Sequence, residues 1–144
     1  MKTKPNKHKL FIRFLGGVGE IGKNMTAFEY GKDIIIVDAG LAFPTEDMPG
    51  IDLVIQDISY LIANKDRVRG VVLTHGHEDH IGGLPYLLKE LKIPVFGTKL
   101  TLTLAENKMR EHKISDYNFN CVTAGSIISL GCFKVEFINV NHSI

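Results

Sequence analysis

The sequence predicts a layered α/β domain, and three features support this prediction. Short apolar runs of strand length alternate along the chain with longer segments in which apolar residues recur at helical spacing. Turn-forming residues such as glycine and proline separate these segments. The order is a strand-rich opening, then strand–helix–strand–helix, then further strands, which is typical of helices layered on a sheet. With 144 residues, the chain is long enough to bury a core of its own.

The first half of the chain is predicted to open with three strands, over Leu10–Leu15, Met25–Tyr30 and Ile34–Asp38. Gly31–Asp33 has the composition of a hairpin turn between the second and third of them. Ala39–Gly50 contains two prolines and two glycines, and we expect it to be a long loop. A helix is expected around Asp57–Asn64, because the apolar residues of that segment fall at helical spacing.

The second half is predicted to alternate strands with helices. Leucines recur at i, i+3, i+4 and i+7 from Leu84, which predicts an amphipathic helix starting near Ile81. A second helix is expected over Leu100–Lys113. The last two predicted strands should pair as a hairpin across Gly131 and Cys132. The predicted strands of this half are Gly70–Thr74, Val95–Phe96, Ile127–Leu130 and Phe133–Ile138.

Composition and charge limit the classes of function. The chain has 17 Lys and Arg against 16 Asp and Glu, so it is no polycation as a whole. The basic residues 1–9 are expected to form a solvated tail ahead of a domain over residues 10–144, with a local nucleic-acid contact as the alternative. No apolar run approaches the roughly 20 residues of a membrane span. Neither Cys121 nor Cys132 lies in a Cys-x-x-Cys spacing, so we expect a reduced, cytoplasmic protein without a membrane partner.

The chemistry of the chain is concentrated just after a predicted buried strand, where His75, His77, Asp79 and His80 stand within six residues. Imidazole and carboxylate groups suit zinc, manganese or iron, and both can bind metal at neutral pH. Side chains two residues apart in an extended segment, such as His75 and His77, project to the same side. As the chain turns into the next helix, Asp79 and His80 should face a neighbouring position. One loop can thereby serve two metals about 3.5–4 Å apart.

Two residues outside this loop are candidates for the same site. His142 follows the last predicted strand and is a candidate third ligand for the metal held by the first two histidines of the loop. Asp38 ends a buried strand, and its carboxylate is expected to accept backbone donors at the turn, to hold imidazole N–H groups of the metal loop in place, or to do both. His8 lies in the basic tail and His112 at a polar helix end, where solvated or capping roles are expected.

The segment Gly17–Gly22 fits the pattern G-x-G-x-x-G and follows a predicted strand, which superficially indicates dinucleotide binding. That function requires a helix to begin immediately, so that its N-terminus meets the pyrophosphate. The next segment, Asn24–Tyr30, is predicted to be a strand instead. We therefore interpret the glycines as a hairpin loop.

The pattern His75-x-His77-x-Asp79-His80, with Asp38 upstream and His142 downstream, resembles the metallo-β-lactamase superfamily. Flanking segments extend the resemblance to the ribonuclease J family, which belongs to the β-CASP branch of metallo-β-lactamase nucleases in bacteria. It implies a layered αββα fold of which this chain is the N-terminal part, without the β-CASP and C-terminal domains. The segments that carry the resemblance are Gly16–Asn24, Val37–Gly40, Pro49–Asp52, Leu73–Gly83 and His142–Ile144.

The resemblance also assigns roles to single residues. It implies that His75, His77 and His142 hold one divalent ion, with zinc expected and manganese as the alternative. Asp79 and His80 would contribute to a second ion, and Asp79 would be the catalytic residue that orients the nucleophile. The bridging aspartate and the last histidine of the family are expected beyond residue 144, so we expect little or no activity from these residues alone.

The function that the resemblance implies is metal-dependent hydrolysis of RNA in RNA maturation and decay, as a 5′→3′ exonuclease, an endonuclease or both. The implied partners are single-stranded or 5′-monophosphorylated RNA and, in the full-length protein, further copies of the chain or of a paralogue. Two alternatives stay open. One is a small-molecule metallohydrolase of the same fold, such as a thioesterase, and the other is a non-catalytic partner subunit of an RNA-degrading complex.

Overall fold

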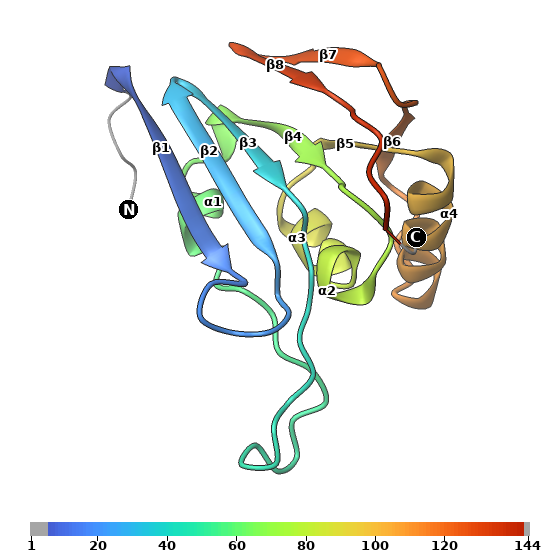
Figure 1. Cartoon of the computed structure of the whole chain (residues 1–144). Helices are drawn as coiled ribbons and strands as arrows, with labels where there is room; N and C mark the ends of the chain where they lie inside the picture. The colour runs from blue at the N-terminus through green and yellow to red at the C-terminus, as the bar shows by residue number, and fades with distance from the viewer. Residues whose placement is uncertain (1–5, 143–144) are drawn as a thin grey trace.

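A six-stranded sheet lies at the centre of the computed structural model, which describes residues 6–142, with side chains from residue 9 onward (Figure 1). The strands follow one another across the sheet in chain order. The first three strands pair with one another in antiparallel fashion, and the third to the sixth pair in parallel. They are β1 (Asn6–Gly16), β2 (Met25–Gly31), β3 (Asp33–Val37), β4 (Val68–Val72), β5 (Pro94–Gly97) and β6 (Asn118–Cys121).

The helices lie behind the sheet in Figure 1 and bury one of its faces. The leucines predicted to share a helix face are buried there, against Ile34 and Ile36 of β3, Val71 of β4 and Val95 of β5. Each fully buried aliphatic side chain contributes about 1.5–3 kcal/mol relative to exposure. The helical elements are α1 (Ser59–Ala63), the 3₁₀ turn η1 (Lys65–Arg67), α2 (Glu78–Ile81), α3 (Leu84–Glu90) and α4 (Lys99–Glu111).

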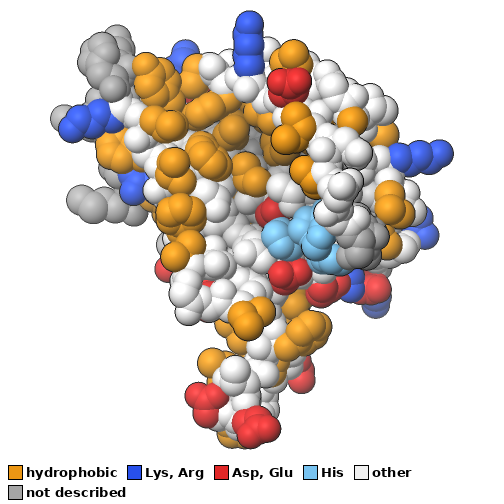
Figure 2. Space-filling model, in the orientation of Figure 1, with side chains coloured by type: hydrophobic (Ala, Val, Ile, Leu, Met, Phe, Trp, Pro, Cys, Tyr) orange, Lys and Arg blue, Asp and Glu red, His pale blue; other side chains and the backbone are white. Residues whose placement is uncertain are grey.

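The opposite face of the sheet is covered only in part, by the predicted hairpin of β7 (Ile127–Leu130) and β8 (Phe133–Glu136). Leu130 packs there in one cluster with Ile35 and Val72. The same face continues over β1 and β2, because Ile12 pairs with Phe28 and Phe28 with Ile35. Apolar side chains of those two strands remain exposed, at the upper left of Figure 2. A helix layer, a sheet and a hairpin on its far face agree with the predicted layered α/β fold.

Several boundaries differ from the sequence prediction. β1 begins at Asn6, inside the segment expected to be a tail, with an irregularity in its pairing before Leu10; residues 1–5 lie outside the described range. The helix expected to start near Ile81 is α3, which begins at Leu84, and a separate short helix, α2, ends at Ile81 before Gly82 and Gly83. A Cβ atom on Gly83 would stand 2.2 Å from a backbone oxygen, so the chain bends there to fit against a neighbouring loop. The strand β6 and the turn η1 were not predicted.

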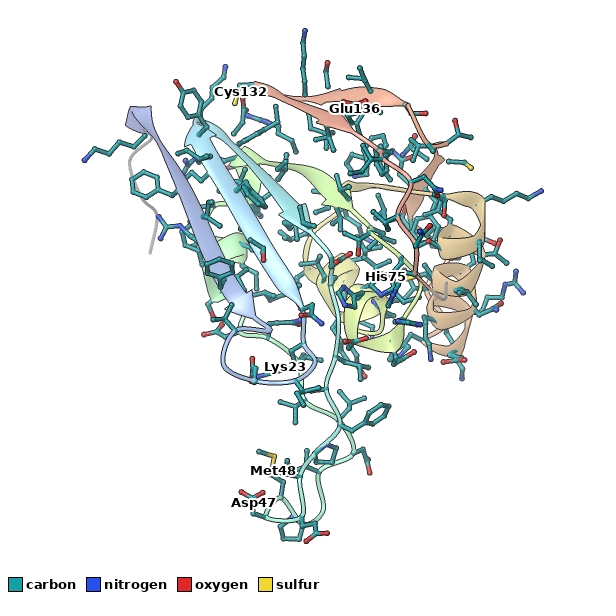
Figure 3. All side chains as sticks on the ribbon, viewed as in Figure 1. Lys23, Asp47, Met48, His75, Cys132 and Glu136 are labelled. Carbon is teal, nitrogen blue, oxygen red and sulfur yellow. The ribbon has the colours of Figure 1, made fainter. Side chains whose placement is uncertain are left out.

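The direction of the strands places several loops at one edge of the sheet. β1, β3, β4 and β5 all run the same way, so the loops that follow them meet beyond their carboxyl ends. The loop after β3 forms a projecting arm (residues 42–54), closed at its base by an antiparallel bridge between Ala42 and Val54. Asp47 and Met48 lie at the tip of this arm (Figure 3). No helix between residues 6 and 142 has the length and apolar character needed to cross a membrane.

Candidate metal centre

The metal loop (residues 74–80) begins where β4 leaves the buried core. Leu73, which directly follows β4, is 1% exposed and donates its backbone N–H to the carbonyl of Phe96 in β5 at 2.8 Å. His77 keeps extended backbone angles and caps α2, and the residues after it turn helical. The loop therefore changes from extended to helical between His77 and Asp79, which is the geometry expected from the sequence.

Three imidazoles converge at this edge. His75 Nε2 and His142 Nε2 each lie 3.1 Å from His77 Nδ1. One candidate ligand atom from each of the three residues lies within 4.8 Å of the others. Figure 2 shows the histidines gathered at one place on this face, and Figure 3 places His75 beyond the carboxyl end of β4. The structure thus brings together three residues that are up to 67 positions apart, as expected for His75, His77 and His142.

The donor set fits a divalent ion of the size of zinc. Nitrogen ligands that surround Zn²⁺ tetrahedrally at about 2.0–2.1 Å stand roughly 3.3 Å from one another. The two 3.1 Å separations around His77 Nδ1 are close to that value. Neutral imidazoles that turn lone pairs toward each other at this distance repel, and a shared cation removes the repulsion. These residues are therefore suited to hold a metal ion.

Asp79 and His80 form a second group beside the three imidazoles. His80 Nε2 lies 3.6 Å from Asp79 Oδ2, and its ring centroid is 4.1 Å from that of His75. The side-chain amide of Asn24 contacts Asp79 Oδ2 at 3.0 Å and His80 Nε2 at 3.2 Å. The two residues thus occupy a position next to the His75–His77–His142 cluster.

Asp38 lies beneath the metal loop and makes both kinds of contact expected of it. Its Oδ1 accepts the backbone N–H of Thr74 at 2.8 Å, and its Oδ2 lies 2.7 Å from His80 Nδ1. A proton on His80 Nδ1 that points to this carboxylate leaves Nε2 as the free lone pair. Asp38 reaches this position with a backbone φ of 61°, in the left-handed region that aspartate tolerates better than most residues.

The surroundings shift the pKa values of two imidazoles in opposite directions. Burial lowers the pKa of His75, and the neighbouring rings of His80, His77 and His142 lower it further. Burial also opposes protonation of His80, but the hydrogen bond and negative charge of Asp38, with Asp79 beyond, outweigh it and raise the pKa. The lower pKa favours the neutral form of His75, which is the form that binds metal.

Two residues that connect the loops to the metal site were not singled out from the sequence. Asn24 follows the glycine-rich loop, and its backbone N–H also donates to the carbonyl of Asp79 at 3.0 Å. The side-chain amide of Gln56 donates to the carbonyls of Lys23 and Gly40 at 2.7 and 2.9 Å. Asn24 was noted in the sequence as the last residue of Gly16–Asn24, one of the segments that carry the family resemblance.

Other residues considered for the site have partners away from the three imidazoles. Glu78 of the metal loop forms an ion pair with Lys108 of α4, with 3.0 Å between Oε2 and Nζ. The ring of His112 packs against Tyr86, 4.9 Å between centroids, at the end of α4. The glycine-rich segment Gly17–Gly22 is followed by the strand β2, as predicted, so it lacks the helix that dinucleotide binding requires.

Comparisons with known proteins extend these observations. The sequence profile of the Metallo-beta-lactamase superfamily matches residues 18–136. The chain is 46% identical over 141 residues to Ribonuclease J of Helicobacter pylori (strain ATCC 700392 / 26695), a match that covers 96% of this chain and 20% of that protein. It is 47% identical over 142 residues to Ribonuclease J2 of Bacillus subtilis (strain 168), which covers 98% of this chain and 26% of that protein.

Among solved structures, the chain is similar to the metallo-beta-lactamase fold protein YhfI from Bacillus subtilis, with a TM-score of 0.58 and 15% identity over 92% of this chain and 53% of that one. At this identity the likeness concerns the fold. The chain spans only about a fifth to a quarter of the length of the ribonucleases named above. The predicted resemblance to ribonuclease J is confirmed as a similarity over almost all of this chain. Because the superfamily profile covers most of the sequence and the fold agrees with it, the chain belongs to the metallo-β-lactamase superfamily.

Proposed function

We propose that this chain forms the metal-binding part of a ribonuclease that hydrolyses phosphodiester bonds of RNA. The observation that carries the proposal is the convergence of His75, His77 and His142 beside Asp79, in a chain 46% identical to a protein named Ribonuclease J. The convergence favours metal-dependent hydrolysis, and the similarity favours RNA as the substrate.

The residues would hold two divalent ions, zinc in the first instance and manganese as the alternative. His75, His77 and His142 would bind one ion, and Asp79 with His80 would contribute to the other. When bound, such ions generate hydroxide at neutral pH and offset the charge that develops on the phosphoryl oxygens. The chain itself supplies imidazole nitrogens and one carboxylate beside them.

Asp79 is the proposed catalytic residue because of its position. Its side chain is 42% exposed, so a substrate in solution can reach it. The amide of Asn24 holds Oδ2 at 3.0 Å and fixes the direction of the carboxylate. A carboxylate held in this way can orient an attacking water by accepting its proton.

The substrate and setting follow from the family resemblance and remain part of the proposal. They comprise single-stranded or 5′-monophosphorylated RNA, attack from the 5′ end or within the chain, a cytoplasmic location, and assembly with further copies or with a paralogue. Contacts to the RNA backbone should weaken as salt is raised.

The test uses the protein at the full length of its gene product, incubated with labelled 5′-monophosphorylated RNA and zinc or manganese. Asp79→Ala is expected to lower kcat/KM by about 10²–10³-fold, the range for removing one group that acts in the transition state. Asp47→Ala, at the tip of the arm, is the matched control and should behave like wild type. A metal chelator should abolish cleavage.

Equal cleavage by wild type and Asp79→Ala would contradict the proposed role of Asp79. If the metal-loaded protein cleaves thioesters but leaves RNA intact, the function is that of a small-molecule hydrolase. If it cleaves neither and instead raises the activity of a co-purified ribonuclease, it is a partner subunit.

A further inference from the structure

Thr74 stands between Asp38 and His75 at the start of the metal loop. Its hydroxyl oxygen lies 2.8 Å from Asp38 Oδ2 and 2.9 Å from His75 Nδ1. We propose that Thr74 is a positioning residue, whose hydroxyl extends the influence of Asp38 to His75 and fixes the tautomer in which His75 presents Nε2 to a metal ion. The inference rests on the proposed function only in requiring that this site binds metal.

The hydrogen-bonding capacities of Asp38, Thr74 and His75 support this role. A carboxylate only accepts hydrogen bonds, so the single hydroxyl proton of Thr74 points to Asp38 Oδ2. The hydroxyl oxygen then turns a lone pair to His75 Nδ1, and that nitrogen must carry the proton of the neutral ring. The lone pair of His75 is thereby placed on Nε2, the atom that lies 3.1 Å from His77 Nδ1 in the cluster.

The same carboxylate acts on a second imidazole without an intermediary. Asp38 Oδ2 also lies 2.7 Å from His80 Nδ1, so the proton of His80 is held on the same ring nitrogen as in His75. Asp38 is 5% exposed, which limits competition from water at its oxygens. One buried carboxylate thus sets the tautomers of two candidate ligands in neighbouring metal positions, one directly and one through Thr74.

If Thr74 served only in packing, its methyl group and backbone would matter and its hydroxyl would not. Its side chain is exposed, so little core packing is at stake, and its backbone N–H bonds to Asp38 Oδ1 whatever the side chain is. Thr74→Val keeps the branched shape and the backbone donor and removes only the hydroxyl. Thr74→Ser keeps the hydroxyl and removes the methyl group. The two substitutions therefore separate shape from hydrogen bonding.

The experiment reads the imidazole nitrogens of the metal-free chain by long-range ¹H–¹⁵N correlation spectra, and zinc affinity by competition with a chelator. Wild type and Thr74→Ser should show His75 with its proton on Nδ1. Thr74→Val should shift His75 toward the Nε2–H form and weaken zinc binding by about 10–100-fold, the usual effect of losing a hydrogen-bond partner of a ligand. Thr103→Val, which removes a hydroxyl bonded to Lys99 O in α4, is the control and should change neither property.

The proposal is overturned if Thr74→Val keeps the wild-type tautomer of His75, or if Thr74→Ser loses as much zinc affinity as Thr74→Val. Thermal unfolding of each variant shows whether the fold is retained. If the valine variant unfolds, Thr74→Ser decides the test, because a folded serine variant whose His75 carries its proton on Nε2 would overturn the proposal. Because no RNA is used, a failed ribonuclease assay with the expected tautomers would refute the proposed function and leave the role of Thr74 standing.

Discussion

His142 is the imidazole of the three-histidine cluster that lies outside the metal loop. It lies in an irregular segment after β8 and is exposed, and its ring contacts those of His75 and His77 at centroid distances of 4.6 and 4.7 Å. His142→Ala is expected to lower zinc affinity by at least about 100-fold, because a partner of a ligand alone contributes 10–100-fold. Chelator competition and elemental analysis measure this effect. His112→Ala is the matched control, and equal zinc content in the two variants would remove His142 from the site.

Among single residues, the sequence predicted those whose residue type and spacing indicate metal binding. Two histidines separated by one residue, next to a carboxylate and just after a buried strand, indicate a metal site by themselves. Asn24 and Thr74 have no such signature, because their roles come from partners 55 and 36 residues away in the chain. Asparagine and threonine are ordinary loop residues until the fold brings those partners within hydrogen-bonding distance.

The loops after β1, β3 and β4 meet at Gly40, where no side chain fits. A Cβ atom there would stand 1.6 Å from the carbonyl oxygen of Asp79, and the Gly40 N–H donates to Asn24 O at 3.0 Å. Gly40→Ala must push the metal loop away, so it should lower the free energy of unfolding by about 1–3 kcal/mol, as other overpacking substitutions do, and should also weaken zinc binding. Urea unfolding and chelator competition test both effects.

Gly97→Ala provides the control at the same edge of the sheet. Its Cβ would lie 3.3 Å from the flexible side chain of Leu102, which can move slightly. If the two alanine variants show the same stability and zinc affinity, the close approach at Gly40 has no role in shaping the site.

Helices and strands could be predicted from the sequence where the hydrophobic pattern of a segment agrees with its packing in the fold. The leucines after the metal loop give a helix in the sequence and in the fold. β6 was missed because its four residues, Asn118–Cys121, lack a strong strand pattern and take their conformation from pairing with β5. The break between α2 and α3 was missed for a similar reason, since the approach of another loop imposes it.

At the scale of the whole molecule, strand direction decides where the candidate site lies. Because β1, β3 and β4 point the same way, their following loops deliver Asn24, Asp38 and the metal loop to one edge. The helices cover one face of the sheet and form the main core with it, whereas the β7–β8 hairpin covers only part of the other face. The order of elements in the sequence predicted the layers, but the extent of this cover depends on the packing of the hairpin.

The part of the sheet that the hairpin leaves uncovered is expected to bind hydrophobic dyes. Leu10, Ile12 and Phe14 of β1 are 54%, 49% and 62% exposed in a row on one face, and contiguous apolar surface of this kind binds hydrophobic dyes. Replacing Leu10 and Phe14 by threonine should lower the fluorescence of a bound naphthalene-sulfonate dye and leave the melting temperature nearly unchanged, because threonine suits a strand and little packing is lost. Ile36→Thr, at a fully buried position on the other face, should instead destabilise the chain by about 2 kcal/mol or more. Undiminished dye binding by the double variant would mean that the dye binds other exposed apolar residues, such as Phe43 of the arm, which is 72% exposed.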